Sequence, residues 1–159
     1  MSQTSTDIEI ARYRPRHLRR ILQIERASFP DEPYTRAIFR DLYKECGELF
    51  LIAKVRRRIA GYIATRVCSG RAEIISIAVD PEYRRAGIGT TLLSIALERL
   101  DESGAHCVEL MVRVDNREAI RFYRRFGFRH AGRVARYYED GQTGLRMRRA
   151  LGTEPPVRK

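Results

Sequence analysis

Apolar and polar positions along this chain repeat with two periods, and each period predicts one kind of secondary structure. Residues 8–13 alternate between apolar and polar side chains, which is typical of a half-buried strand. After Pro15 the apolar residues fall three and four positions apart, as they do on one face of a helix. A second helix is predicted over residues 36–46, because Thr35 can cap its first turn and Gly47 can end it.

Three segments in the middle of the chain are rich in apolar and β-branched residues, as the strands of a sheet are. They cover residues 48–55, 59–67 and 72–79. Consecutive arginines at 56–58 separate the first two segments, so we expect these two strands to form a hairpin.

The second half of the chain carries two more helix patterns, each ended by a glycine. The first has an apolar face over residues 88–100 and stops before Gly104. In the second, Asp115 is the predicted N-cap and Glu118, three residues later, completes a capping box. Gly127 then supplies the left-handed turn that ends this helix.

The remaining strands complete the order of elements. One is expected over residues 106–114, and two more surround a turn at Asp140-Gly141. The resulting order, β-α-α-β-β-β-α-β-α-β-β, indicates one mixed α/β domain over residues 8–151, as the length of 159 residues also favours. Residues 1–7 and 152–159 are expected to be disordered tails.

Composition narrows the class of protein without choosing its partner. The formal net charge is +11 and is carried mostly by arginine, so the chain attracts anions such as nucleic acid, acidic proteins or phosphorylated cofactors. Its three cysteines form no CxxC pair and its three histidines lack ligand spacing, so we expect no metal site. No apolar run approaches the roughly 20 residues of a membrane span, and no signal-peptide core is present. We therefore expect a cytoplasmic protein with no membrane partner.

The most informative stretch is an arginine- and glycine-rich turn at residues 84–90, at the start of a helix. Glycine lets the main chain approach a ligand closely, and a helix N-terminus favours negative charge, so such a turn suits a phosphate. A Walker A motif is excluded because Gly89 is followed by Thr90 rather than lysine. A dinucleotide fingerprint is broken because Leu92 replaces its third glycine. A turn shaped by glycine for geometry alone stays open.

The remaining pattern, R-x-x-G-x-G at residues 84–89, resembles the acetyl-CoA turn of the GNAT acetyltransferases. A second pattern that begins at Asn116, N-x-x-A-I-x-x-Y-x-x-x-G-F, is similar to that family's other signature. Residues 25–35 (ERASFPDEPYT) and 135–147 (ARYYEDGQTGLRM) resemble the first helix-loop segment and the closing hairpin of RimI-type N-terminal acetyltransferases. The likeness covers most of residues 8–151.

The resemblance implies both a fold and a reaction. The fold is one central mixed sheet of about seven strands flanked by about four helices, a layered α/β architecture. The reaction moves an acetyl group from acetyl-CoA to an amine by direct attack in a ternary complex and leaves coenzyme A as product. The RimI-like branch further implies a protein or peptide substrate, with a ribosomal protein as one candidate, acetylated at its N-terminal α-amine. No nucleic acid is required, and the oligomeric state is left open.

By this resemblance, main-chain groups hold most of the cofactor. The pyrophosphate would lie on the turn formed by Arg84, Arg85, Ala86, Gly87, Ile88, Gly89 and Thr90. The pantetheine arm would pair with the strand at Ile77, Ala78 and Val79, which also offers an N–H to the thioester oxygen. Asn116 would hydrogen-bond the cofactor, although a residue at the start of a helix also has a purely structural interpretation.

The resemblance also assigns the acid and raises a question about the base. Tyr123 would protonate the departing thiolate, although core packing is the alternative for a tyrosine in an amphipathic helix. RimI-type enzymes carry a glutamate where this chain has Met111, which cannot accept a proton. Glu109 shares the same face of the strand but lies about 7 Å away, two residues of strand rise. Glu73 matches the catalytic glutamate of other GNAT branches and is our preferred base, acting directly or through a water.

The acceptor is less well determined. Tyr34 and Tyr138, with Tyr137 beside the latter, stand where related enzymes line the peptide groove. An α-amine has a pKa of about 7.7–8.0, against about 10.4 for lysine, so an α-amine tolerates a weaker base. Lysine and small amines remain alternatives within the same class. From other classes, a basic nucleic-acid-binding module and a CoA-binding protein without catalysis also stay open.

Overall fold

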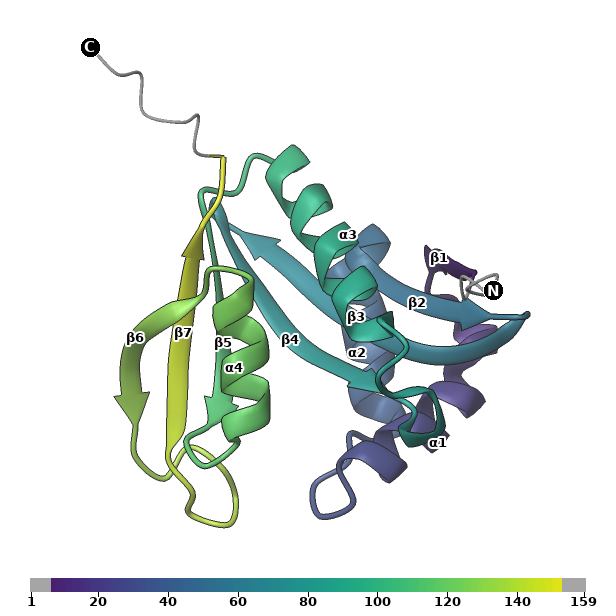
Figure 1. The fold of residues 1–159 in the computed structure, drawn as a ribbon, viewed down its shortest axis with the longest axis horizontal. Helices are drawn as coiled ribbons and strands as arrows, with labels where there is room; N and C mark the ends of the chain where they lie inside the picture. Colours follow the sequence, from purple (N-terminus) through teal and green to yellow (C-terminus); the bar gives the residue numbers. More distant parts are fainter. Residues whose placement is uncertain (1–6, 153–159) are drawn as a thin grey trace, which may run out of the picture. The chain divides into compact units, whose positions relative to one another are not determined.

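The computed structural model describes residues 7–152, which form seven strands and four α-helices in the predicted order (Figure 1). The strands hydrogen-bond as one mixed sheet in the order β1-β2-β3-β4-β5-β7-β6, so the predicted α/β class is confirmed. The strands are β1 (Ile8–Arg12), β2 (Phe50–Val55), β3 (Arg58–Cys68), β4 (Arg71–Val79), β5 (Cys107–Arg113), β6 (Arg129–Val134) and β7 (Gly144–Ala150). The helices are α1 (Leu18–Ser28), α2 (Arg36–Cys46), α3 (Ile88–Glu102) and α4 (Arg117–Arg125), with short 3₁₀ turns η1 (Pro15–His17), η2 (Gly47–Leu49) and η3 (Pro81–Tyr83).

The predicted disordered tails concern, apart from Asp7 and Gly152, residues outside the described range. That prediction and the expected single domain over residues 8–151 both stay predictions. Within the described range, no helix is long and apolar enough to cross a membrane.

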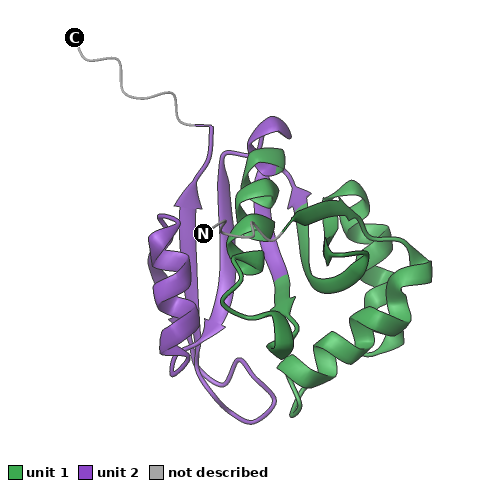
Figure 2. Cartoon of the chain, turned by 45° about the vertical axis from the view of Figure 1, so that its right-hand side comes forward, with its two compact units in different colours: residues 1–66, 76–99 green, residues 67–75, 100–159 purple. Residues whose placement is uncertain are grey.

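The chain forms two compact units, which are coloured separately in Figure 2. Of the described residues, 7–66 and 76–99 belong to unit 1, and 67–75 and 100–152 belong to unit 2. The boundary falls inside β4 and near the end of α3, so each of these elements contributes to both units.

Unit 1 places helices on both faces of its strands. Phe39 of α2 contacts the rings of Phe50 on β2 and Tyr62 on β3, with ring centroids 6.3 and 5.6 Å away. Gly61 precedes Tyr62 and therefore points to the opposite face. On that face Ile88 and Leu92 of α3 lie close to it. The alternation of one strand thus directs α2 to one side and α3 to the other.

Replacing Gly61 by alanine is expected to destabilise the fold. An added Cβ would lie 2.8 Å from the carbonyl oxygen of Ala78 and 3.3 Å from a methyl carbon of Ile88. Because the first of these atoms is main chain, β4 and α3 must shift, at a cost of about 1–3 kcal/mol. Urea unfolding measures this cost: Gly61→Ala is expected to unfold at a lower midpoint concentration of urea than the parent chain, with the same dependence of the unfolding free energy on urea. A midpoint equal to or above that of the parent chain would contradict the close packing.

Unit 2 is built around β5. This strand pairs in parallel with the first residues of β4 and antiparallel with β7, which pairs antiparallel with β6. Val108, Leu110 and Val112 are buried, whereas Glu109 and Met111 are only half-buried. Glu109 and Met111 therefore share a face, as their spacing predicts.

Most predicted helix and turn signals are confirmed. Thr35 accepts a hydrogen bond from the N–H of Ile38 (3.3 Å) and so caps α2, while Gly104 and Gly127 have φ values of +83° and +86° at the ends of α3 and α4. The β2–β3 hairpin also forms, and both residues of its turn, Arg56 and Arg57, have positive φ.

Two predicted details differ from the structure. The cap of α4 is Asn116, whose Oδ1 accepts the N–H of Ala119 at 3.1 Å, and not Asp115. The helix begins one residue later than expected, so the capping oxygen comes from the next side chain. The closing strands pair as predicted, but β6 ends at Val134 and β7 begins at Gly144, so the turn closed by the Gly141 N–H and the Tyr138 carbonyl lies within a nine-residue loop and does not join the strands directly.

Candidate functional site

The arginine-glycine turn adopts an unusual backbone just before α3. Arg85 and Gly87 have φ values of +65° and +80°, so the chain reverses sharply before the helix begins at Ile88. Arg84, Arg85 and Gly87 are exposed, and Ile88 is buried. An added Cβ on Gly87 would meet no atom within 4 Å, so its glycine is required by backbone conformation and by access to the main chain rather than by crowding.

The start of α3 leaves main-chain donors available for an anion. The carbonyl oxygen of Gly87 accepts both the N–H and the hydroxyl of Thr91, each at 2.9 Å, and so fixes the first turn. The N–H groups of Ile88, Gly89 and Thr90 precede the first intrahelical donor and point out of the helix end. The helix dipole adds favourable charge there. This turn can therefore bind a phosphate group with main-chain N–H groups, and the exposed Thr90 hydroxyl lies beside them.

The buried carboxylate of Asp80 stabilises the loop that precedes this turn. Asp80 accepts the N–H of Glu82 at 3.0 Å, which shapes η3, and its other oxygen pairs with Arg20 of α1. Burial alone would raise the pKa of Asp80, but the hydrogen bonds from Glu82 and Arg20 and the charges of Arg20 and Arg58 lower it. Asp80 therefore stays ionised and anchors the loop that leads into the turn.

The last residues of β4 run into this loop. Ala78 is buried beneath Gly61, and Ile77 and Val79 are half-buried. The Val79 carbonyl oxygen accepts a weak hydrogen bond of 3.4 Å from the Ser28 hydroxyl. Unit 1 thus brings together the strand and turn residues that the sequence assigns to the cofactor.

In unit 2, Asn116 has a structural role and a spare donor. Its oxygen caps α4, so the structural interpretation of this residue holds. Its Nδ2 carries two further N–H bonds, and these remain chemically suited to a carbonyl acceptor of a ligand.

Tyr123 lies two turns further along α4 and is buried, with 8% of its surface exposed. Its ring contacts those of Phe122 and Phe128, with centroids 5.4 and 5.7 Å away. Burial, with a smaller contribution from Tyr138, raises the pKa of Tyr123 well above its ordinary value. The hydroxyl therefore stays protonated at neutral pH and is available as a hydrogen-bond donor.

The two candidate carboxylates of unit 2 are register partners. Glu73 of β4 lies opposite Glu109 of β5 in the parallel pairing, so their side chains share a face. Glu109 is bound by the guanidinium of Arg148, one of whose nitrogens lies 2.7 Å from Oε1. Glu73 is half-buried near the start of its strand. The methionine at 111 lies on the same side of β5 and adds no acid-base group.

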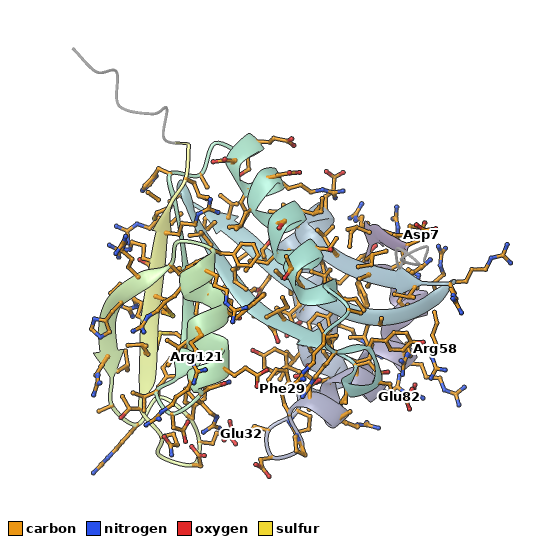
Figure 3. The ribbon with its side chains drawn as sticks, in the orientation of Figure 1. Asp7, Phe29, Glu32, Arg58, Glu82 and Arg121 are labelled. Carbon is orange, nitrogen blue, oxygen red and sulfur yellow. The ribbon has the colours of Figure 1, made fainter. Side chains whose placement is uncertain are left out.

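The tyrosines expected at the acceptor are held by different networks. In unit 1, the N–H of Tyr34 donates to Glu25 at 3.1 Å, on the α1–α2 loop that also carries Phe29 and Glu32 (Figure 3). In unit 2, the Arg113 guanidinium lies 4.3 Å above the ring of Tyr138. Both tyrosines are half-buried.

The β6–β7 loop is fixed by the same arginine. Arg113 pairs with Asp140 at 2.7 Å, and Asp140 also accepts the N–H of Gln142 at 3.0 Å. The adjacent Tyr137 is exposed and meets Tyr138 edge-on, with ring centroids 4.9 Å apart. The described residues contain no cluster of three or more His, Cys, Asp or Glu side chains that could hold a metal ion.

Sequence reasoning missed Glu25, a glutamate with 1% of its surface exposed. A signal was present, since Glu25 lies four residues after Ile21 and three after Leu22, within the apolar stripe of α1. A charged residue on the buried stripe of a helix must find hydrogen-bond partners in the core. The first of these partners is Tyr34, and the second is Tyr62.

Comparison with known proteins places this chain among acetyltransferases. The sequence profile of the acetyltransferase (GNAT) family matches residues 17–128. An N-alpha-acetyltransferase of Sulfolobus acidocaldarius is 34% identical over 140 residues, covering 80% of this chain and 83% of that protein.

Two solved structures are similar throughout. The ribosomal-protein-S18-alanine N-acetyltransferase from Escherichia coli has a TM-score of 0.83 at 25% identity, covering 96% of this chain and 99% of that chain. Arabidopsis thaliana Naa50, in complex with the bisubstrate analogue CoA-Ac-MVNAL, has a TM-score of 0.81 at 25% identity, covering 91% and 99%.

Proposed function

This chain belongs to the acetyltransferase (GNAT) family, it uses acetyl-CoA as acetyl donor, and we propose that its acceptor is the N-terminal α-amine of a protein or peptide. The observation that supports acetyl-CoA binding most directly is the turn before α3, whose positive-φ residues expose main-chain donors at a helix N-terminus. The similarity to N-alpha-acetyltransferases narrows the acceptor to the α-amine.

The proposed cofactor contacts follow the shape of acetyl-CoA. The pyrophosphate lies on the turn, where N–H groups and the helix dipole offset its charge. The pantetheine arm pairs with the end of β4, and the spare amide nitrogen of Asn116 donates to it. The turn contacts come from Arg84, Arg85, Ala86, Gly87, Ile88, Gly89 and Thr90, and the strand contacts from Ile77, Ala78 and Val79.

The proposed chemistry uses one acid and one carboxylate base of unit 2. The amine attacks the thioester carbon, and negative charge develops on its oxygen, which a β4 N–H stabilises. Glu73 accepts a proton from the amine nitrogen, directly or through a water. Tyr123 is the proposed acid for the departing thiolate, and burial keeps its hydroxyl protonated so that it can hydrogen-bond the sulfur.

The proposed acceptor contacts are Tyr34 and Tyr138, and a ribosomal protein is the proposed substrate class. The first tyrosine is fixed through its main chain and the second through the cation above its ring. The similar Escherichia coli enzyme acts on ribosomal protein S18, which supports this class. We also propose that the protein is cytoplasmic. Its three cysteines are free thiols, as is usual in a reducing compartment.

A peptide-library assay tests the acceptor. The purified chain, acetyl-CoA and peptides with free N-termini and internal lysines are expected to give products acetylated on the α-nitrogen, located by mass spectrometry. The matched control is the same library with blocked N-termini, which is expected to remain unmodified. Acetylation of lysine in the blocked library would show that the acceptor is the lysine ε-amine and not the α-amine.

A further inference from the structure

A buried carboxylate of unit 1 is not used by the chemistry above. Glu25 of α1 receives two hydrogen bonds, one from the N–H of Tyr34 at 3.1 Å and one from the Tyr62 hydroxyl. The Tyr62 hydroxyl also contacts the hydroxyl of Ser76 at 2.8 Å. The side chains of Glu25, Tyr62 and Ser76 come from α1, β3 and β4, and they form a continuous row of hydrogen bonds within unit 1.

The direction of this chain follows from its chemistry. An ionised carboxylate can only accept hydrogen bonds, so the single proton of Tyr62 is donated to Glu25. The oxygen of Tyr62 must then accept the proton of Ser76. Ser76 is left with oxygen lone pairs that can accept an N–H from a group other than these three side chains. Every bond therefore points from Ser76 toward Glu25, which is the orientation that proton transfer toward the carboxylate requires.

The surroundings suit a proton acceptor. Burial raises the pKa of Glu25, while the hydrogen bonds from Tyr62 and Tyr34 partly lower it again. Burial and the adjacent Glu25 raise the pKa of Tyr62 well above its ordinary value, so Tyr62 stays neutral and passes protons without losing its own. Phe39 of α2 packs edge-on against the rings of both tyrosines. Besides burial, the pKa of Glu25 is set by the Tyr62 hydroxyl and the Tyr34 main-chain N–H, and no cation contributes to it.

The open end of the chain lies on the strand that we assign to the thioester. Ser76 directly precedes Ile77 in β4 and is half-buried, whereas Glu25 is closed off from solvent. Acetylation removes two protons from an ammonium group, one before the nitrogen can attack and one after the new bond has formed. One carboxylate in unit 2 accounts for only one of them.

We propose that Ser76, Tyr62 and Glu25 form a proton relay that takes the first proton from the acceptor ammonium, an inference that rests on the proposed function. The ammonium N–H bond breaks and its proton passes to the Ser76 oxygen, as the Ser76 proton moves to Tyr62 and the Tyr62 proton moves to Glu25. Both hydroxyls end neutral, Glu25 ends as a carboxylic acid, and the nitrogen gains a free electron pair for attack. Glu73 takes the second proton, and the Glu25 proton returns to solvent by the same path after product leaves.

The relay predicts a distinctive dependence on pH. A variant in which the relay is interrupted can use only the fraction of acceptor molecules whose amine is already neutral. For an α-amine of pKa about 8 this fraction is roughly 3% at pH 6.5 and above roughly 95% at pH 9.5. We therefore expect Tyr62→Phe, Glu25→Gln and Ser76→Ala each to lower kcat/KM by up to about 30-fold at pH 6.5 and to approach the parent chain at pH 9.5.

Two controls separate this role from a structural one. Tyr13→Phe removes the hydroxyl of another buried tyrosine, which stacks on Phe50 in the same core, and is expected to leave the profile unchanged. Glu73→Gln is expected to lower kcat/KM at both pH values, since it acts after attack. Melting temperature and acetyl-CoA binding are recorded for every variant, and the half-buried Ser76→Ala tests the relay even if a core variant fails to fold.

The outcomes are distinct for the relay and for the acceptor. A defect that stays constant across pH in Tyr62→Phe and Ser76→Ala, or no defect at all, overturns the relay. If mass spectrometry places the acetyl group on lysine, the proposed acceptor is wrong, and the relay then predicts that the defect disappears only near the lysine pKa of about 10.4. The pH at which the defect disappears thus supports or overturns the relay for either acceptor.

Discussion

Replacing Gly87 by glutamate is expected to abolish acetyl-CoA binding. The φ of +80° at this position is strained for any residue with a Cβ, so the turn that presents main-chain donors would be distorted. The new carboxylate would also lie beside the proposed pyrophosphate, where like charges repel. Isothermal titration calorimetry is expected to give micromolar affinity for the parent chain and no measurable heat for Gly87→Glu.

The chain offers a close control for the strain and the charge. Gly104 is also exposed, has a φ of +83°, and would meet no atom within 4 Å if it carried a Cβ. Gly104→Glu therefore introduces the same kind of strain and the same charge at the other end of α3. It is expected to bind acetyl-CoA as the parent chain does. Equal affinity for Gly87→Glu and the parent chain would reject the turn as the cofactor site.

The order of elements could be predicted from sequence because each element carries a period of its own and most have a stop signal. Thr35, Gly104 and Gly127 act through neighbouring main-chain groups, so local sequence is sufficient to place them. Asp115 and Asn116 are both good caps, and local sequence cannot choose between them. The choice depends on where the chain leaves β5, and the pairing of strands in the sheet determines that position.

The candidate cofactor residues could be proposed from sequence because they form continuous stretches whose proposed function depends on main-chain geometry. The state of the carboxylates could not, because it depends on partners distant in sequence. Glu109 is bound by Arg148, which is 39 residues away, and Glu25 meets Tyr62, which is 37 residues away. A sequence pattern shows that such a residue is unusual in its position but does not show what satisfies it.

The pairing of the two unit 2 carboxylates also predicts unequal effects of neutralising them. Glu73→Gln is expected to reduce kcat about 10²- to 10⁴-fold, the usual contribution of a general base. Glu109→Gln is expected to reduce it far less, because the Glu109 carboxylate is already held by the guanidinium of Arg148. Steady-state kinetics at saturating acetyl-CoA measures both effects.

Glutamine keeps the size and one acceptor oxygen of the side chain, so both variants are expected to bind acetyl-CoA with the affinity of the parent chain. Unchanged binding together with reduced turnover would locate the loss in the chemical step, since the cofactor is then held normally in each variant. The opposite order of effects would make Glu109 the base and require Arg148 to release it during turnover. The position of Met111, on the same face of β5 as Glu109, makes that release the alternative that this pair of variants decides.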